Sequence, residues 1–377
     1  MAVEVTTAAQ RPSPEDRAHT LPALTGVRFL AAFYVVLEHG LPWLAARWRL
    51  PSLLATFLAS GYLAVSMFFL LSGFILTYTY RGLQGGENRL RFWWARFARI
   101  YPVYVLSLLL ALPFEPGLGW GAKLSVLAMV QAWNPWKPGL AGAWNFPAWT
   151  LSVEAFFYLC FPFLLFWLKT RRGRNQLLLL AFFGAVCVLG RTPLQGLQGR
   201  VGEPPIAASL PLPLLRLPEF VLGMLIGLRF LRRAASIPEN RSPWIPVALA
   251  STTLALLSLP IGEWKSLVVV PFGFLVYELA LGKDWCARLL STRPMILLGG
   301  ASYAVYLLQY PVRSWVRIAF ARFPQPLASQ GAPLTPVILV LLSILIFKYW
   351  EEPARRFIRG TFVVRSAKRK AEMIRKI

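Results

Sequence analysis

Long apolar stretches, separated by short polar or basic connections, follow one another along most of the 377-residue chain. A helix needs roughly 20 mostly apolar residues to cross a bilayer. Ten stretches approach that requirement, and they lie near 24–45, 54–80, 100–113, 145–168, 177–190, 211–228, 244–260, 264–282, 295–312 and 334–350. The pattern predicts an all-α fold, a polytopic bundle of about ten transmembrane helices.

The composition favours the same class of protein. Hydrophobic residues make up 56% of the chain and charged residues only 15%, with a mean hydropathy of +0.54. Soluble domains are closer to one quarter charged, so too little polar surface remains to cover a water-soluble globule. The net charge of +24 would by itself suggest nucleic-acid binding. Because the chain is so apolar, we instead expect a multi-pass protein of the cytoplasmic membrane with no nucleic-acid partner.

The basic residues also predict the orientation of the helices. The stretch 122–136 is apolar but bounded by Gly and Pro, and counting it as an eleventh span would invert every later one. Positive residues concentrate on the cytoplasmic side of membrane proteins. With ten spans and a cytoplasmic N-terminus, 28 basic residues fall on the inner side and ten on the outer side. We therefore expect both termini in the cytoplasm and no crossing by 122–136.

This organisation divides the chain into three parts. Residues 1–22 form a polar cytoplasmic N-terminal tail, residues 23–352 form the membrane domain, and residues 353–377 form a basic cytoplasmic C-terminal tail. The last part is suited to contact with anionic membrane lipids. The three cysteines lack the spacing of a metal site, and we expect no bound metal.

The first predicted span contains three ionisable residues, Arg28, Glu38 and His39. Such residues are costly inside a bilayer and indicate function. Arg28 and His39 are eleven positions apart, so on a helix they share a face and lie about 16 Å apart along the axis. Arginine suits an anion and histidine exchanges protons near neutral pH. The orientation places Arg28 near the cytoplasmic end and His39 in the outer half.

Glu154 lies in the fourth predicted span, which runs from outside to inside. This direction places Glu154 in the outer half, and we expect it to share the depth of His39. A carboxylate beside an imidazole fixes its tautomer and stabilises the imidazolium. The alternative is a structural ion pair between Glu154 and an arginine of a neighbouring helix.

Two further motifs carry candidate binding residues. The second span contains Ser72-Gly73, a small pair that allows close approach of another helix or of a ligand. The connection after it, 91–102, is rich in arginine and aromatic residues and includes Arg96 and Arg99. Such a connection either anchors the chain at the membrane interface or binds phosphate through its guanidinium groups.

These motifs, in this order, resemble those of the acyltransferase-3 family over about residues 20–360. The resemblance rests on the Arg28 to His39 spacing, the run around Ser72, the Arg96–Arg99 connection and the sequence before Glu154. The late segments 302–311 and 352–356 are also similar to it. Members of the family are integral-membrane proteins that acylate extracytoplasmic carbohydrate and related acceptors.

The resemblance implies a mechanism and its substrates. The donor is expected to be acyl-CoA, with acetyl-CoA the first choice and no tightly bound cofactor. Its phosphates would meet Arg28, Arg96 and Arg99, with Ser72 beside them. The acceptor would be a carbohydrate or glycolipid hydroxyl, activated by His39 with Glu154 as its orienting partner. Direct transfer and a covalent acyl-histidine both fit the sequence.

Some roles stay open from the sequence alone. Candidate donors to the oxyanion are Ser72, Asn145 and Tyr101. Many family members have His at the position of Gln309, so no catalytic role is carried to that residue.

The rival class of function is a secondary transporter or flippase. It would use intramembrane ionisable residues as a proton relay. The residues of that relay would be His39, Glu154, Arg216, Glu219 and Glu278.

Overall fold

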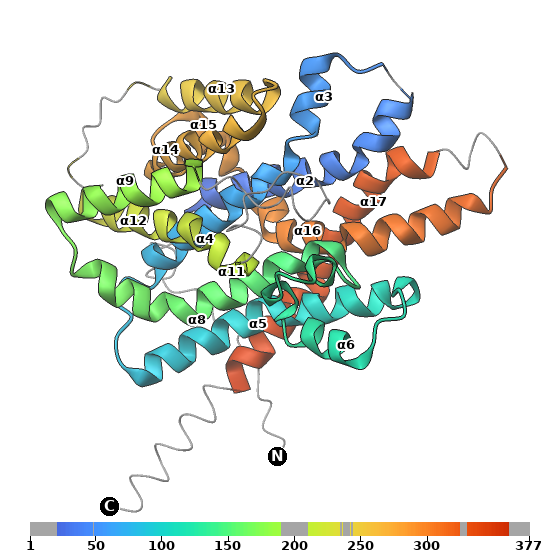
Figure 1. The fold of residues 1–377 in the computed structure, drawn as a ribbon, viewed down its shortest axis with the longest axis horizontal. Coiled ribbons are helices and arrows are strands. Elements are labelled where there is room, and N and C mark those ends of the chain that lie inside the picture. Colours follow the sequence, from blue (N-terminus) through green and yellow to red (C-terminus); the bar gives the residue numbers. More distant parts are fainter. Residues whose placement is uncertain are drawn as a thin grey trace, which may run out of the picture.

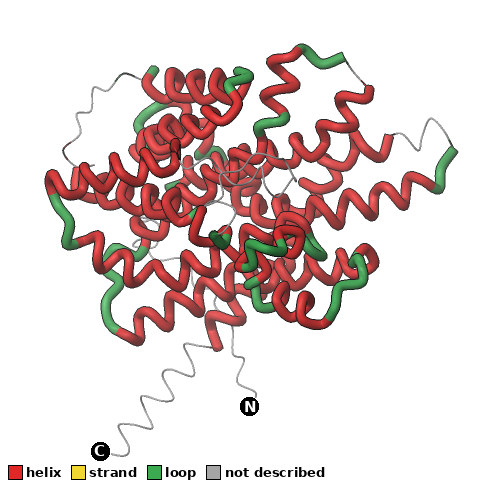
Figure 2. The backbone as a smooth tube through the Cα atoms, in the orientation of Figure 1, coloured by secondary structure: helices red, strands yellow, loops and turns green. Residues whose placement is uncertain are grey.

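The computed structural model describes residues 21–47, 49–189, 210–233, 236, 242, 244–324 and 330–361. Within these residues the chain folds into helices and connecting turns, without β-strands (Figure 2). The all-α prediction is therefore confirmed for this part. The predicted tails lie mostly outside the described residues. The predicted boundary at 353 falls within a helical stretch that continues to Thr361.

The helices of the first half of the chain begin with α2, which carries the candidate histidine and first arginine. Their bounds are α2 Pro22–Arg47, α3 Ser52–Leu58, α4 Ala64–Thr79, α5 Gly86–Ala111, α6 Trp120–Leu127, α7 Pro138–Ala141, α8 Trp149–Lys169 and α9 Gly173–Leu189 (Figure 1). Helix α5 corrects one expectation, because the arginine-rich connection 91–102 lies within this helix and is not a loop. Its apolar side packs inward, with Phe92 and Ala98 buried.

The helices of the second half complete the bundle. They are α11 Leu212–Leu215, α12 Leu217–Arg233, α13 Ile245–Ser258, α14 Val269–Leu281, α15 Trp285–Leu290, α16 Arg293–Ala321, α17 Gly331–Ile346 and a π-helical turn Phe347–Glu351. In Figure 1 the helices α13, α14 and α15 gather at one corner, and α5, α6 and α8 lie along the opposite side. Helices α2, α4, α12 and α16 lie between these groups.

Six helical stretches within the described residues have the length and composition needed to cross a membrane. They are Ser52–Thr79, Gly86–Phe114, Phe146–Lys169, Trp264–Leu281, Arg293–Ala321 and Gly331–Thr361. Two apolar helices, α9 and α13, are shorter. Helix α2 has 26 residues, about 39 Å, and is not among these six. The chain is thus a multi-pass membrane protein, and ten spans with both termini inside remain a prediction.

The stretch 122–136 takes the form expected of a segment that does not cross. It contains the end of α6, which has eight residues, and a three-residue 3₁₀ turn, Gln131–Trp133. Eight residues of α-helix measure about 12 Å, well short of the ~30 Å hydrocarbon core.

Helices α4 and α12 pack backbone against backbone in the centre of the bundle. A Cβ added to Gly73 would lie 2.1 Å from the Phe220 carbonyl oxygen, and one added to Gly223 would lie 2.0 Å from the Leu70 carbonyl oxygen. The two backbones therefore touch, as small residues allow in membrane helices. This confirms the close approach that the Ser72-Gly73 pair predicts, with another helix as the partner of the glycine.

Candidate active site

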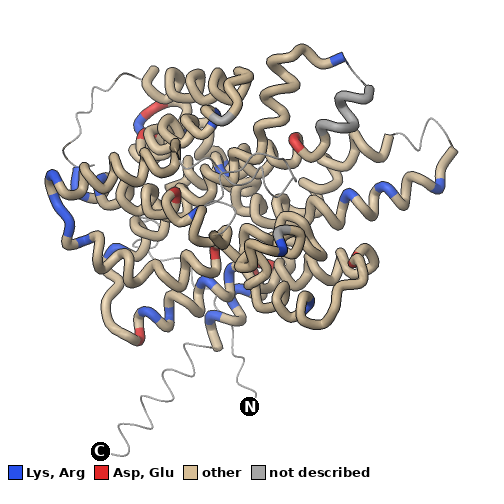
Figure 3. The backbone as a smooth tube through the Cα atoms, in the orientation of Figure 1, with Lys and Arg blue, Asp and Glu red and all other residues tan. Residues whose placement is uncertain are grey.

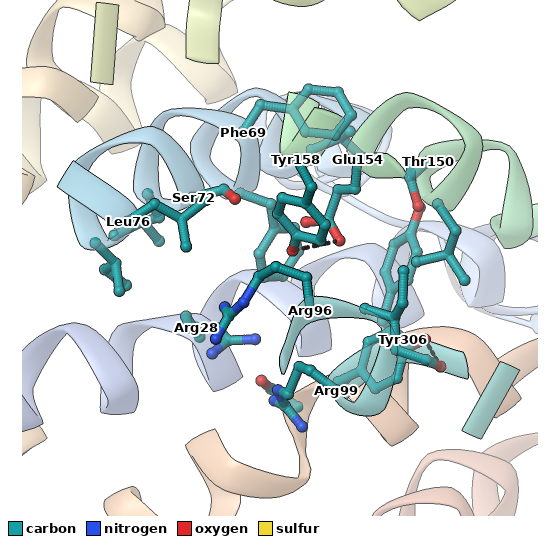
Figure 4. A pocket seen from close by; sticks show the side chains of 18 residues that line it. Arg28, Phe69, Ser72, Leu76, Arg96, Arg99, Thr150, Glu154, Tyr158 and Tyr306 are labelled. Carbon is teal, nitrogen blue, oxygen red and sulfur yellow. Dashed lines mark hydrogen bonds between the residues drawn. The ribbon is translucent and has the colours of Figure 1, made fainter. Parts of the chain in front are cut away.

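A cavity of about 110 Å³ lies where α2, α4, α5, α8 and α16 meet. Its polar lining includes every candidate binding residue from the sequence together with one of the two catalytic candidates. These residues are Arg28, Ser72, Arg96, Arg99 and Glu154 (Figure 4). Helix periodicity explains the local arrangement, because Arg96 and Arg99 are three positions apart on α5 and face the same side. The remaining lining is largely apolar and aromatic.

Arg96 lies among aromatic rings with part of its guanidinium group unpaired. Its Nη2 donates to the Tyr80 hydroxyl at 3.3 Å, and its Cζ lies 5.5 Å from the Tyr80 ring centre and 5.9 Å from that of Tyr158. Its Nε is buried and has no hydrogen-bond partner within the described structure. A buried donor without an acceptor is costly, and an anion in the cavity would satisfy it.

Arg99 differs from the other two arginines because it already has a counter-charge. Its guanidinium forms an ion pair with Glu351, whose side chain is fully buried. The Tyr303 ring lies 5.4 Å from its Cζ. Glu351 belongs to the π-helical turn after α17, a form that is frequent at functional sites. Sequence reasoning missed this residue, although it directly precedes the motif at 352–356.

Glu154 lies in the cavity lined by Arg28, Arg96 and Arg99, called the arginine cavity below, and not beside His39. It accepts a hydrogen bond of 3.2 Å from the Tyr158 hydroxyl, and Tyr158 is the ring beside Arg96. Phe146, whose ring contacts that of His39 at 5.9 Å, lies eight positions before Glu154, or roughly 12 Å along a helix. The expected shared depth of Glu154 and His39 is therefore corrected: Glu154 lies near the level of Arg28.

The partner of His39 is Gln309 of α16. The His39 Nδ1 and the Gln309 Oε1 are 2.9 Å apart. The Gln309 Nε2 donates to the Tyr306 carbonyl oxygen at 2.7 Å, and the Gln309 side chain is buried. Because the amide nitrogen is used in this way, the amide oxygen faces the imidazole and accepts from Nδ1. The neutral ring then carries its proton on Nδ1 and has a free acceptor at Nε2.

A spacing in the sequence indicates the side of α16 on which Gln309 lies. Tyr303, Tyr306 and Gln309 recur every three residues, so they share one side of α16. Tyr303 and Tyr306 line the cavity, and Gln309 lies one turn further along the helix. One side of α16 therefore connects the arginine cavity to His39.

Of the three candidate oxyanion donors, the structure brings only Ser72 to the cavity. Asn145 is buried elsewhere and donates to the Ser107 hydroxyl and to the Leu307 carbonyl, both at 3.0 Å. Tyr101 stacks on Phe97 with ring centres 4.6 Å apart and is not among the residues that line the cavity.

Two of the residues proposed for a proton relay, Arg216 and Glu219, form an ion pair with each other. Arg216 pairs with Glu219 at 3.0 Å and donates to the Ser66 hydroxyl at 3.0 Å. Both charged side chains are buried, and the Arg216 guanidinium lies 5.2 Å from the Phe69 ring centre. Through Ser66 of α4 and Glu219 of α12, the pair links the two helices.

The fold is a bundle with several membrane-spanning helices, and Arg28 of the cavity lies on the same helix, α2, as His39. The chain belongs to the acyltransferase-3 family, whose sequence profile, described as an acyltransferase domain, matches residues 21–348. The resemblance is thereby confirmed, and the protein is a membrane acyltransferase.

Curated relatives carry the same class of activity in their names. The chain is 30% identical over 312 residues to the acyltransferase MdmB of Streptomyces mycarofaciens, covering 78% of this chain and 79% of that protein. It is 23% identical over 371 residues to the O-acetyltransferase OatA of Staphylococcus aureus, covering 90% of this chain and 56% of OatA. The chain thus spans just over half the length of OatA. No solved structure is detectably similar to it.

Proposed function

We propose that this protein transfers an acyl group, acetyl in the first instance, from acyl-CoA to a hydroxyl of an extracytoplasmic or lipid-linked carbohydrate. It would act in the cytoplasmic membrane. The observation that carries the proposal is the arrangement along α2. Arg28 lies in the arginine cavity, and His39 lies about 16 Å further along the same helix face, a length that an extended pantetheine arm covers.

The arginine cavity suits the phosphates of the donor. Guanidinium groups form strong charge-assisted hydrogen bonds with phosphate oxygens. Arg28 and Arg96 are the two arginines of the cavity that form no ion pair within the described residues, whereas Arg99 is held by Glu351. We therefore assign the phosphates to Arg28 and Arg96 first, with Arg99 completing the positive lining.

His39 supplies the base in this proposal. Its free Nε2 takes the proton from the acceptor hydroxyl, and the hydroxyl oxygen forms a bond to the thioester carbonyl carbon. The carbon–sulfur bond then breaks, and the coenzyme A thiolate receives the proton from His39. The products are the ester and free coenzyme A, and Gln309 keeps the ring in the required tautomer.

Glu154 acts at the donor end. It lies in the cavity with the unpaired arginines and bonds to Tyr158. Its carboxylate balances their charge when the phosphates leave, and it holds the Tyr158 ring beside Arg96. This replaces the sequence-based role of orienting His39.

The test uses the full chain in proteoliposomes with acetyl-CoA as donor. The acceptor is an extract of surface glycans and lipids from cells that lack the gene. For the wild-type chain we expect acceptor-dependent release of coenzyme A thiol together with a new ester. In His39→Ala the rates of both should fall by at least about 10²-fold, which is the low end of the contribution of general base catalysis. Binding of acetyl-CoA should be retained in this variant.

The matched control is Arg288→Gln, an exposed change outside the cavity, which should leave the rate unchanged. Full transfer by His39→Ala would overturn the assignment of the base. Gradient-driven solute uptake without thiol release would overturn the acyl-CoA reaction itself. A second measurement uses acetyl-CoA labelled in its acetyl group and omits the acceptor. Label that stays on the wild-type chain but is absent from His39→Ala would show the covalent route.

A further inference from the structure

A second cavity, of about 330 Å³, lies at one edge of the bundle, between the start of α9 and the end of α12. Its lining residues are Arg172, Gly173, Gln176, Leu177, Arg229, Arg232 and Arg233. Figure 3 shows the corresponding concentration of basic residues along that edge of the molecule. None of these residues lines the arginine cavity of the candidate active site. The distribution of basic residues along the sequence predicts that this edge faces the cytoplasm.

Four guanidinium groups share this cavity, and the described residues that line it include no carboxylate. Arg232 is fixed, because its Nη1 donates to the Gln176 Oε1 at 2.8 Å and to the Arg171 carbonyl at 3.1 Å. Burial and the nearby charge of Arg172 lower the pKa of the Arg232 guanidinium. Like charges held together without a counter-ion are a favourable site for an anion.

The backbone adds to the positive potential. Helix α9 begins at Gly173 and has no acidic residue in its first turn. The N-terminus of a helix carries a partial positive charge and unpaired N–H groups, which favour anions. The Gln176 Nε2 also donates to the Leu225 carbonyl at 3.4 Å. Gln176 therefore links both helices and keeps the arginines of α12 beside the start of α9.

The chemistry of the neighbouring surface indicates what else the anion carries. Leu177 lines the cavity and is 48% exposed, and Leu178 and Phe182 further along α9 are 56% and 59% exposed. Exposed apolar side chains on a helix of a membrane protein face hydrocarbon. A headgroup site that opens onto such a surface suits a ligand with a phosphate at one end and acyl chains at the other.

We propose that this cavity binds the phosphate headgroup of an anionic phospholipid of the cytoplasmic leaflet, with its acyl chains lying along the exposed apolar surface of α9. Arg172, Arg229 and Arg233 contact the phosphate oxygens, and Arg232 with Gln176 shapes the floor of the site. The proposal is independent of the acyl-transfer reaction, because it uses no residue of the arginine cavity.

The test is native mass spectrometry of the full chain in detergent, titrated with phosphatidylglycerol or phosphatidylcholine. We expect tighter binding of phosphatidylglycerol. The double variant Arg172→Gln/Arg233→Gln should weaken that binding by about tenfold or more, since one basic residue near an anionic surface contributes about a fivefold effect. The charge-conserving double variant Arg172→Lys/Arg233→Lys should retain much of the affinity for phosphatidylglycerol.

The matched control removes the same charge from the same predicted side of the membrane. Arg288→Gln/Arg293→Gln replaces two exposed arginines that do not line the cavity, and it should change phosphatidylglycerol binding by less than about twofold. An equal loss in the control would overturn the site, because only the net charge would matter. Equal binding of both lipids, or displacement of phosphatidylglycerol by millimolar inorganic phosphate, would also overturn it.

Discussion

The two ends of the candidate active site use opposite means to prepare a side chain for chemistry. The donor end assembles three arginines from α2 and α5 around one cavity, with Glu154 among them and Glu351 behind. The histidine end has a single imidazole held by the neutral amide of Gln309. The difference matches the two tasks. Under the proposed function, positive charge binds the phosphates, whereas the imidazole must be unprotonated to act as a base, and a neutral amide orients it without stabilising its protonated form.

Within the donor end there is a second contrast, between paired and unpaired arginines. The charge of Arg99 is balanced by the fully buried carboxylate of Glu351. Arg99 is therefore held in place by the protein itself, without a ligand. Arg96 keeps a buried donor without a partner. The cavity lining thus contains one arginine, Arg99, that is already paired, and another, Arg96, whose buried N–H group a bound anion would pair.

The largest effect is expected from removing the counter-charge of Arg99. Glu351→Gln leaves a buried guanidinium without its partner, which costs about 3–5 kcal/mol of the free energy of unfolding. Thermal or denaturant unfolding of the purified chain in detergent measures it. The control is Glu352→Gln, whose partners Arg355 and Arg356 lie at 3.5 and 3.4 Å in a more exposed position and which should cost less than about 1 kcal/mol. Equal losses would show that the pair with Arg99 is not special.

The next effect separates the donor end from the histidine end. Arg96→Gln removes charge-assisted hydrogen bonds to the donor, each of about 1.5–3 kcal/mol, so KM for acetyl-CoA should rise about 10- to 100-fold with little change in kcat. Steady-state kinetics over a range of acetyl-CoA concentrations measures both constants. Arg91→Gln, which removes an exposed pair with Glu87 at 2.7 Å on the same helix, should change neither. A fall in kcat alone would move Arg96 to the reacting atoms.

The smallest effect tests the neutral partner of the base. Gln309→Met keeps the approximate shape but removes the acceptor for His39 Nδ1, so kcat should fall about tenfold, a loss of about 1.4 kcal/mol, while KM for the donor stays constant. Gln309→Glu restores an acceptor. The negative charge of the new carboxylate stabilises the His39 imidazolium. His39 should then lose its proton at higher pH, so the rising limb of the pH profile of kcat should shift to higher pH. An increase in KM without a change in kcat would contradict the positioning role.

Much of the donor end could be predicted from the sequence because it depends on regular helix geometry. The spacing of Arg96 and Arg99, and the place of Ser72 in an apolar helix, bring them to one cavity with Arg28 and Glu154. The tolerance of a helix for interior arginines was underestimated at 91–102, where buried aromatic packing keeps α5 continuous.

The parts that sequence reasoning missed are contacts between distant segments. The depth of Glu154 depends on α8 starting at Trp149, after the 3₁₀ turn Phe146–Ala148, and periodicity does not determine the start of a helix within a few residues. The pairs Arg99 with Glu351 and His39 with Gln309 join segments 252 and 270 positions apart. No local pattern encodes which helices become neighbours.

The glycine contact between α4 and α12 has a consequence for the cavity beside it. With Gly73 and Gly223 pressed against carbonyl oxygens of the opposite helix, these two helices leave no side-chain layer between them that can be compressed or rearranged. Residues of α4 form much of the cavity lining, so this wall is rigid. Any change in the width of the cavity would therefore have to come from its other walls, which α2, α5, α8 and α16 supply.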